Sequence, residues 1–193
     1  MLELIIPFDQ SSTASTSRRS FTMCFLGRAA RAASRKITVP YSSTVVLYQQ
    51  FLSPYLRFEL FDYQRELIEC YHNNRYSINM LGRQMGKTTV AAGYLLWFAM
   101  FQPDSMILVA AHKYTGAQEI MSRIRFAYEN VPDFIRAGVT SYNKGSLEFD
   151  NGSRIVSATT TETTGRGMSL TLVYADEFAF VQPRIAREFW TSI

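Results

Sequence analysis

The pattern of apolar and polar positions changes character near residue 58. Beyond that point apolar residues either recur at helical spacing or gather in short continuous runs, whereas residues 1–57 cannot be assigned a fold. The pattern predicts helices over 62–73, 88–101 and 114–130, with a further helix beginning at 184. It predicts strands over 76–81, 105–111, 139–142, 146–149, 154–158 and 170–175.

The order and composition of these elements predict the fold class. The runs 105–111 and 170–175 are continuously apolar, as expected of parallel strands that are buried on both faces. The segment 88–101 is almost wholly apolar, as expected of a helix buried against a sheet. Asn151-Gly152 is a strong hairpin signal between two of the shorter strands. With right-handed crossovers, this alternation predicts an α/β fold with a mainly parallel sheet flanked by helices.

Composition and charge divide the chain in the same place. With 47% apolar and 19% charged residues in 193, the chain is globular, and it is long enough for one domain with a real core. Residues 1–57 contain seven basic and two acidic residues, and 58–193 contain thirteen basic and fourteen acidic. The net charge of +4 therefore does not indicate a DNA-binding face on the globular part. We interpret 1–57 as a flexible, basic, Ser/Arg-rich extension and linker, and 58–193 as the folded domain.

The cysteine spacing and the length of the apolar runs argue against a metal-binding or disulfide framework and against a membrane span. Cys24 and Cys70 show no metal-ligand or framework spacing, which favours a reduced setting. The longest apolar runs are too short to span a bilayer, so no membrane association is expected.

The clearest motif lies between the strand at 76–81 and the helix at 88–101. A strand, a glycine-containing loop and a helix in this order are typical of the phosphate cradle of P-loop nucleotide hydrolases, because the loop offers backbone N–H groups at a helix N-terminus. Lys87 is expected to reach the β and γ phosphates, and the Thr88 hydroxyl to bind Mg²⁺. The usual first glycine would be residue 81, yet that residue is leucine and Gly82 follows one position late. The candidate ATP-binding residues of this loop are Gly82, Arg83, Gln84, Met85, Gly86, Lys87, Thr88 and Thr89.

A second motif ends the apolar strand at 170–175. Asp176 and Glu177 follow it directly, at the sheet edge where α/β proteins bind ligands and where the phosphate loop is also expected. Asp176 is expected to contribute to the Mg²⁺ site together with Thr88, and Glu177 to orient or deprotonate the attacking water. Two adjacent acids at a strand end are common, but their occurrence after a phosphate loop favours an ATPase.

Three further positions have candidate roles. Phosphoryl transfer needs positive charge near the γ-phosphate, and Arg83 within the loop or Arg166 in a Thr/Gly-rich loop would supply it. Arg166 would act in cis or on a neighbouring subunit. Gln64 precedes the loop by about twenty residues, and its amide can pair with the adenine edge, with Tyr63 stacking on the base.

The combination of motifs resembles the N-terminal ATPase of terminase large subunits from tailed bacteriophages of the contractile-tail type. The segments that follow the order of this family are Tyr63-Gln64-Arg65, Gly82 to Thr89, Leu108 to Lys113, Pro132-Asp133-Phe134, Asn143 to Ser146, Asp150 to Ser153, Arg166-Gly167 and Val173 to Phe180. The displaced loop glycine is itself a feature of the family.

This resemblance implies a RecA-like P-loop ATPase of the ASCE type that uses ATP and Mg²⁺. It also implies the role of a motor that translocates double-stranded DNA into a procapsid, in a homo-oligomeric ring on the portal protein and with a small terminase subunit. The location would be the cytoplasm of the infected bacterium. Arg83 would be the catalytic loop arginine, Glu177 the catalytic glutamate and Gln64 the adenine-side glutamine.

In the family, a coupling motif and a nuclease domain follow the Asp-Glu strand, and both would lie beyond Ile193. We therefore expect a partial ATPase domain, incomplete at its C-terminus, whose sheet lacks at least one central strand, and we assign no nuclease to it. Two alternatives stay open: a superfamily 2 nucleic-acid helicase or translocase, and an inactive nucleotide-binding fragment.

Overall fold

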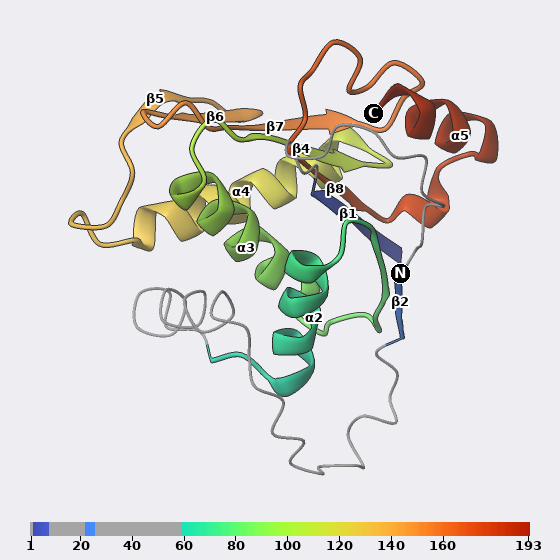
Figure 1. The fold of residues 1–193 in the computed structure, drawn as a ribbon, viewed down its shortest axis with the longest axis horizontal. Coiled ribbons are helices and arrows are strands. Elements are labelled where there is room, and N and C mark those ends of the chain that lie inside the picture. The colour runs from blue at the N-terminus through green and yellow to red at the C-terminus, as the bar shows by residue number, and fades with distance from the viewer. Residues whose placement is uncertain (1, 8–21, 26–58) are drawn as a thin grey trace.

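The computed structural model describes residues 2–7, 22–25 and 59–193, which form an eight-stranded sheet with helices on both faces (Figure 1). The helices are α2 (Asp62–Asn73), α3 (Lys87–Phe101), α4 (Tyr114–Asn130) and α5 (Pro183–Ser192), with a 3-10 turn, η2 (Phe178–Phe180), before α5. The strands are β1 (Leu2–Pro7), β2 (Thr22–Phe25), β3 (Ser77–Met80), β4 (Met106–Ala111), β5 (Val139–Tyr142), β6 (Ser146–Phe149), β7 (Arg154–Thr159) and β8 (Leu172–Asp176). They are ordered β2-β3-β1-β8-β4-β7-β6-β5.

The predicted elements after residue 58 are confirmed, and most boundaries agree within one residue. Helices α2 and α4 have the predicted bounds. Helix α5 begins one residue earlier than predicted, at Pro183, because proline is well suited to the first position of a helix. The largest shift is in β8, which begins at Leu172 rather than at 170. The chain before it is still turning, with the Leu170 N–H donating to the Met168 carbonyl (3.0 Å).

The sheet is mixed. Strand β4 runs parallel to both β7 and β8, while β6 is antiparallel to β7 and to β5. The β6–β7 hairpin turns at Asn151-Gly152 as predicted, with Gly152 at φ 82° and the Phe149 N–H bound to the Ser153 carbonyl (2.8 Å). The α/β class is thus confirmed, and the sheet with its flanking helices is compatible with a RecA-like fold. The prediction of a mainly parallel sheet is wrong, because four of the seven pairs among the described strands are antiparallel: β1–β3, β1–β8, β5–β6 and β6–β7.

Strand β1 is the main departure from the sequence-based expectation. It lies between β3 and β8 and is antiparallel to both, pairing Leu4 with Ile78 on one side and with Ala175 on the other. The expectation that the sheet would be left with an open central position is therefore wrong for β3 and β8, because β1 pairs with the facing edges of both strands. Strand β2 pairs with the outer edge of β3. The rest of 1–57, interpreted above as a flexible linker, lies outside the described residues.

Two apolar cores lie on opposite faces of the sheet, as the alternation of side chains along a strand requires. On one face, Ile107, Val109 and Tyr174 pack with α2, α3 and α4. On the other face, Leu108 and Val173 pack against α5. Helix α3 is apolar all round and almost fully buried, as predicted, because it lies between α2 and α4 on one face of the sheet (Figure 1). The strand ends that carry the candidate motifs are thereby held from both sides.

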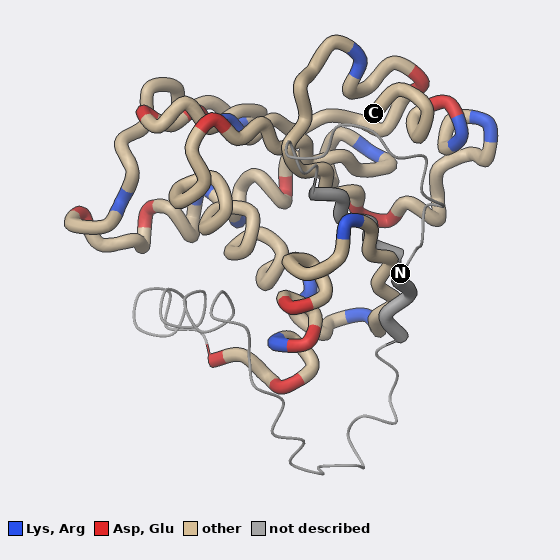
Figure 2. The backbone as a smooth tube through the Cα atoms, in the orientation of Figure 1, with Lys and Arg blue, Asp and Glu red and all other residues tan. Residues whose placement is uncertain are grey.

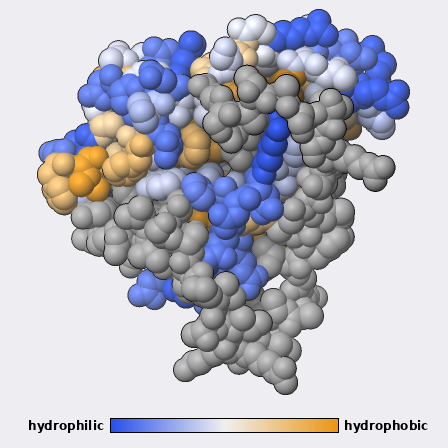
Figure 3. Space-filling view, viewed as in Figure 1, coloured by the Kyte–Doolittle hydropathy of each residue, from blue (hydrophilic) through white to orange (hydrophobic). Residues whose placement is uncertain are grey.

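The surface carries acidic and basic positions that are interspersed along the described chain (Figure 2), in keeping with the balanced charge of 58–193. Apolar surface gathers at the α4–β5 end (Figure 3), where Phe134 is 76% exposed. No described helix is long and apolar enough to cross a membrane. Cys70 of α2 is disulfide-bonded, so the reduced state favoured by the cysteine spacing is not the one in the structure.

Candidate functional site

The candidate phosphate loop connects the end of β3, at Met80, to the start of α3, at Lys87. Two of its residues have left-handed backbone, Gln84 with φ 60° and Gly86 with φ 70°. Gly86 is the N-cap of α3, and its carbonyl accepts the first hydrogen bonds of that helix. The first N–H groups of α3 have no partner within the helix, so this end of the loop can bind an anion.

The displaced glycine of the loop has a packing explanation. Leu81 is only 4% exposed and belongs to the main core, so the position that is usually glycine anchors the loop instead. A Cβ atom on Gly82 would lie 3.2 Å from the sulfur of Met85, which itself packs against the core. A side chain at 82 would therefore crowd the Met85 side chain, which would have to shift by a few tenths of an ångström.

The two sequence motifs meet in an ion pair. The Lys87 Nζ lies 2.9 Å from Oδ1 of Asp176, and the two side chains are only 7% and 14% exposed. Lys87 begins α3 and Asp176 ends β8, so the contact joins segments that are 89 residues apart. The same carboxylate oxygen accepts the N–H of Glu177 (3.0 Å). This arrangement places the loop lysine and both acids at one edge of the sheet.

The residue after the ion pair has a strained backbone. Glu177 adopts φ 53° and ψ 32°, a left-handed conformation that non-glycine residues seldom take. It turns the chain sharply from β8 into the 3-10 turn at Phe178–Phe180, and its side chain remains partly exposed. Strained residues of this kind cluster at functional sites, so the conformation supports the interest in Glu177 that the sequence raised.

Thr88 and Asp176 are the residues that suit Mg²⁺. Thr88, in the first turn of α3, is partly exposed, and the Asp176 carboxylate is held beside Lys87. Within the described part of the chain no three His, Cys, Asp or Glu side chains come together as a metal cluster. Mg²⁺ in nucleotide sites is bound by one or two protein oxygens together with phosphates and water, and one hydroxyl and one carboxylate fit that donor set.

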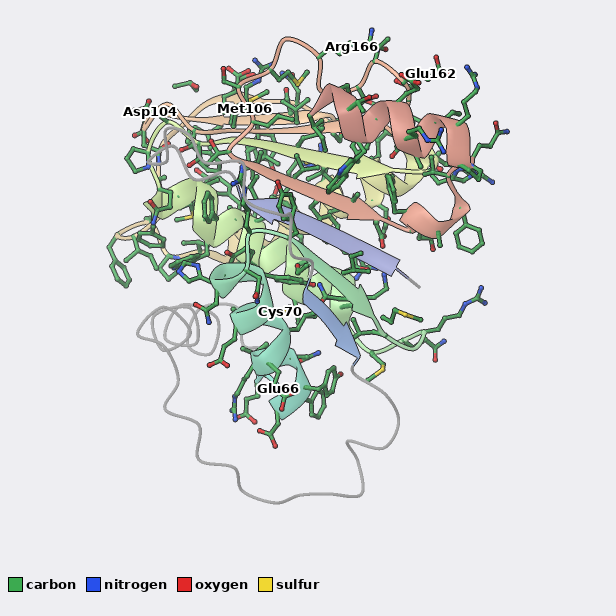
Figure 4. All side chains as sticks on the ribbon, turned by 45° about the vertical axis from the view of Figure 1, so that its right-hand side comes forward. Glu66, Cys70, Asp104, Met106, Glu162 and Arg166 are labelled. Carbon is green, nitrogen blue, oxygen red and sulfur yellow. The ribbon has the colours of Figure 1, made fainter. Side chains whose placement is uncertain are left out.

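The two candidate arginines have different surroundings. Arg83 lies in the phosphate loop and is exposed. Arg166 is exposed between Gly165 (φ 92°) and Gly167 (φ 75°), in the loop that lies beside α5. Arg166 and its neighbour Glu162 lie at the opposite side of the molecule from Glu66 and Cys70 of α2 (Figure 4). Neither candidate arginine forms an ion pair with another described residue.

Tyr63 and Gln64 contact the phosphate loop itself. The Tyr63 hydroxyl donates to the Met85 carbonyl (2.7 Å), and the Gln64 amide nitrogen donates to the same oxygen (3.2 Å). Gln64 is 1% exposed, and its amide oxygen accepts the N–H of Phe61 (3.1 Å). The structure thus brings both residues to the loop, and the role predicted for them at the adenine base stays a prediction.

One neighbour of the loop was missed from the sequence. Arg123 of α4 donates to the hydroxyl of Thr89 (3.1 Å) while pairing with Glu119 (3.1 Å). The spacing of Glu119 and Arg123 is typical of a pair along one helix face. That spacing does not indicate which neighbouring helix the face meets, so the contact with Thr89 appears only in the tertiary structure.

The fold and the site together define a class of protein. It is an α/β protein in which a glycine-containing loop at the start of a buried helix meets a strand that ends in two acids. Residues 78–193 match the family model described as terminase large subunit, T4likevirus-type, N-terminal. The chain therefore belongs to the family of N-terminal domains of T4-like terminase large subunits. The resemblance predicted from the motifs is confirmed, and a terminase role in phage DNA packaging follows. The family also favours the terminase interpretation over the superfamily 2 helicase. All predicted site residues except Tyr63 and Gln64 lie within the matched segment.

Proposed function

We propose that this chain binds ATP with Mg²⁺ at the loop 82–89 and hydrolyses it to power translocation of double-stranded DNA into a procapsid. The observation that carries the proposal is the buried Lys87–Asp176 pair, 2.9 Å apart, which joins the loop to the acidic strand end. Removing two opposite charges from water costs several kcal/mol per ion, about as much as their attraction returns, so such a pair is weak evidence for stability alone. Its place at the C-terminal edge of the sheet favours a ligand role.

Separate residues would bind the phosphates and the Mg²⁺ ion. The N–H groups at the start of α3 and the Lys87 ammonium would hold the phosphates. Thr88 and Asp176 would bind Mg²⁺, which neutralises the charge on the transferred phosphoryl group when it is bound. Because Lys87 and Asp176 pair with each other at 2.9 Å, the nucleotide and its Mg²⁺ would replace this contact with one to each residue.

Glu177 would orient and deprotonate the attacking water. Its backbone turn directs the chain away from β8 directly after the metal-binding acid, and its carboxylate remains accessible from solvent. Arg83 would stabilise the charge that develops on the γ-phosphate from within the loop, and Arg166 would do so on a neighbouring subunit. A ring of subunits on the portal protein, working with a small terminase subunit in the cytoplasm of the infected host, is the assembly in which these roles fit together.

The test is ATP turnover by the chain with and without Mg²⁺, compared with Glu177→Gln. Loss of a general base lowers turnover by roughly 10²–10⁴-fold, and we expect a decrease in that range. Glu66→Gln is the matched control, because it makes the same chemical change on an exposed face of α2 (Figure 4). If wild type binds ATP but shows no turnover that depends on Glu177, the chain is an inactive nucleotide-binding fragment and the proposed hydrolysis is wrong.

A further inference from the structure

The hairpin between β5 and β6 carries a segment to which the proposed chemistry assigns no role. Its tip, residues 143–146, lies beside the C-terminal half of β7, because Ser146 pairs with Val156 (Figure 1). The end of β7 lies beside Ala111 of β4, which in turn lies beside Asp176. Neighbouring strands are about 4.8 Å apart, so the tip is roughly three strand spacings from the acidic strand end, at the same edge of the sheet.

Three neighbouring groups hold the tip in place. The Gly145 carbonyl accepts both the N–H (2.8 Å) and the hydroxyl (3.0 Å) of Ser157 in β7. Arg125 of α4 donates to the Asn143 carbonyl (3.0 Å). A Cβ atom on Gly145 would lie only 3.0 Å from the Tyr114 hydroxyl, so the tip packs closely against the start of α4. The backbone of the tip is therefore fixed, while the side chain of Lys144 is exposed.

The sheet edge around this tip contains cations and no acids. The segments 105–118, 137–147 and 155–161 meet there, and none of them contains Asp or Glu. Lys113, the N-cap of α4, is exposed like Lys144. Neither lysine forms an ion pair with another described residue, and nor does Arg125. Elsewhere in the described chain, carboxylates pair with Arg65, Lys87, Arg123, Arg136, Arg154 and Arg184.

This distribution qualifies what the net charge indicated. Residues 58–193 are balanced overall, with thirteen basic and fourteen acidic residues, but the balance is an average over the whole domain. Charges further apart than about 8 Å are largely screened at physiological salt, so acids elsewhere on the surface do not neutralise this edge. It therefore keeps a local positive potential, which attracts an anionic partner.

The arrangement of the cations fits a polyanion better than a single phosphate. Lys113 and Lys144 come from different elements, the start of α4 and a hairpin tip, and are exposed on the surface. Separate exposed cations suit a partner that offers many phosphates in a regular array. A lysine ammonium is a point charge that contacts phosphate oxygens without reading base edges.

We infer that this cationic edge, defined by Lys113, Arg125 and Lys144, is a contact surface for the phosphodiester backbone of double-stranded DNA. The inference rests on the proposed function, in which double-stranded DNA is the translocated substrate. It assigns to the hairpin tip the task of presenting Lys144 to the DNA from a fixed backbone. The contact is independent of DNA sequence and lies at the same sheet edge as the candidate ATP site.

The experiment measures how the affinity of the full chain for DNA depends on salt. Two fluorescent duplexes of unrelated sequence are titrated between about 50 and 200 mM salt, the range in which phosphate contacts are most easily counted. The variants are Lys113→Gln, Lys144→Gln and the two combined. Arg187→Gln is the matched control, because it removes an exposed cation of α5 that also forms no ion pair with a described residue. Thermal midpoints are recorded, and binding is measured well below them.

We expect each lysine variant to weaken binding by about threefold to tenfold at the lower salt concentration, on both duplexes alike. Each lost phosphate contact should make the slope of log affinity against log salt shallower by about one, and the double variant should lose about two. Arg187→Gln should leave the slope unchanged. ATP turnover without DNA should be the same in all variants, because neither lysine contacts the candidate nucleotide site.

Three results would overturn the inference. One is a double variant with the wild-type slope, and this includes a wild type that does not bind DNA at all. Another is an equal change from Arg187→Gln, which would mean that charge anywhere on the surface attracts DNA. The third is a loss confined to one duplex, because backbone contacts act on all sequences alike.

Failure of the proposed hydrolysis would give a different result. A chain without Glu177-dependent turnover, whose DNA affinity still depends on the two lysines, would support the cationic edge and refute the hydrolysis. A chain with that turnover, whose DNA affinity is indifferent to both lysines, would refute the cationic edge alone.

Discussion

Two arginine-bearing loops of this protein are held in different ways. The phosphate loop, residues 81–86, is tied to the interior at both ends, by the buried Leu81 and by the Met85 carbonyl that α2 holds. The threonine–glycine loop, residues 160–167, is held mainly by its own turn, in which the Thr164 hydroxyl contacts both Thr161 (2.6 Å) and the Thr159 carbonyl (2.7 Å). It is also attached to β4, through the Thr160 N–H that donates to the Ala111 carbonyl (2.9 Å), and to α5, through the Ser192 hydroxyl (2.9 Å to the Thr164 carbonyl) and the Arg184–Glu162 pair.

The difference bears on what each arginine can do. Arg83 sits in a loop whose backbone is fixed relative to Lys87, so its position at the site is set within one chain. Arg166 sits in an exposed turn between two left-handed glycines, on the other side of the molecule from α2 (Figure 4). The proposed roles of Arg83 within the chain and of Arg166 on a neighbouring subunit follow this difference.

The largest expected effect is on ATP turnover, when Arg83 or Arg166 is replaced by alanine. Arginines that stabilise phosphoryl transfer contribute roughly 10³–10⁵-fold, so Arg83→Ala should lower kcat of the isolated chain by about 10³-fold. Arg166→Ala should leave the isolated chain unchanged and lower turnover only in the assembled ring. Steady-state ATP hydrolysis, with and without portal-bound assembly, measures both. Equal losses in the isolated chain would refute the role of Arg166 in trans.

The second comparison concerns one ion pair from each region. Lys87→Ala leaves the Asp176 carboxylate buried and unpaired, which should lower the free energy of unfolding by about 3–5 kcal/mol. Arg184→Ala breaks a pair whose side chains are 75% and 39% exposed, and the expected loss is below about 1 kcal/mol. Urea denaturation without nucleotide measures both. The double variant Lys87→Met with Asp176→Asn is the control, and it should recover part of the loss. A loss from Lys87→Ala no larger than that from Arg184→Ala would contradict the buried character of the pair.

The smallest expected effect compares two glycines of similar backbone conformation. Gly86 (φ 70°) and Gly167 (φ 75°) both have left-handed backbone. Replacing either by alanine puts a side chain on that backbone, which costs about 1 kcal/mol. Only at Gly86 would the new methyl group meet a neighbour, the Gln64 amide at 2.9 Å, whereas nothing lies within 4 Å of it at Gly167. Gly86→Ala should therefore cost about 1 kcal/mol more than Gly167→Ala, the value of one disturbed hydrogen bond, in thermal unfolding. Equal costs would show that α2 does not hold the loop tightly.

The sequence predicted the local elements and the family well, because both depend on neighbouring residues. Helical spacing located α2 and α4 to the residue, and apolar runs located the strands that end at the two motifs. The loop 82–89 and the Asp176-Glu177 pair were recognised as candidates from their own residues and from the elements that flank them. The match of 78–193 to the terminase family confirms the interpretation those motifs supported.

Other features depended on contacts between distant segments, which spacing along the chain does not encode. Strand β1 was not predicted, since a short, mostly apolar segment far from the motifs carries no signal of which strands it pairs with. The direction of the Gln64 amide was also undetermined, because a glutamine in a first helical turn can face a ligand or a loop.

By itself, then, the sequence determined which segments after residue 58 are helices and strands, where the candidate phosphate loop and the acidic strand end lie, and to which family the chain belongs. Only the tertiary structure decided that β1 lies between the two motif strands, that Lys87 pairs with Asp176, and that α2 holds the Met85 carbonyl. The physical reason is that hydrophobic periodicity and turn chemistry act over a few residues. Strand pairing and side-chain contacts between elements are settled by how those elements pack.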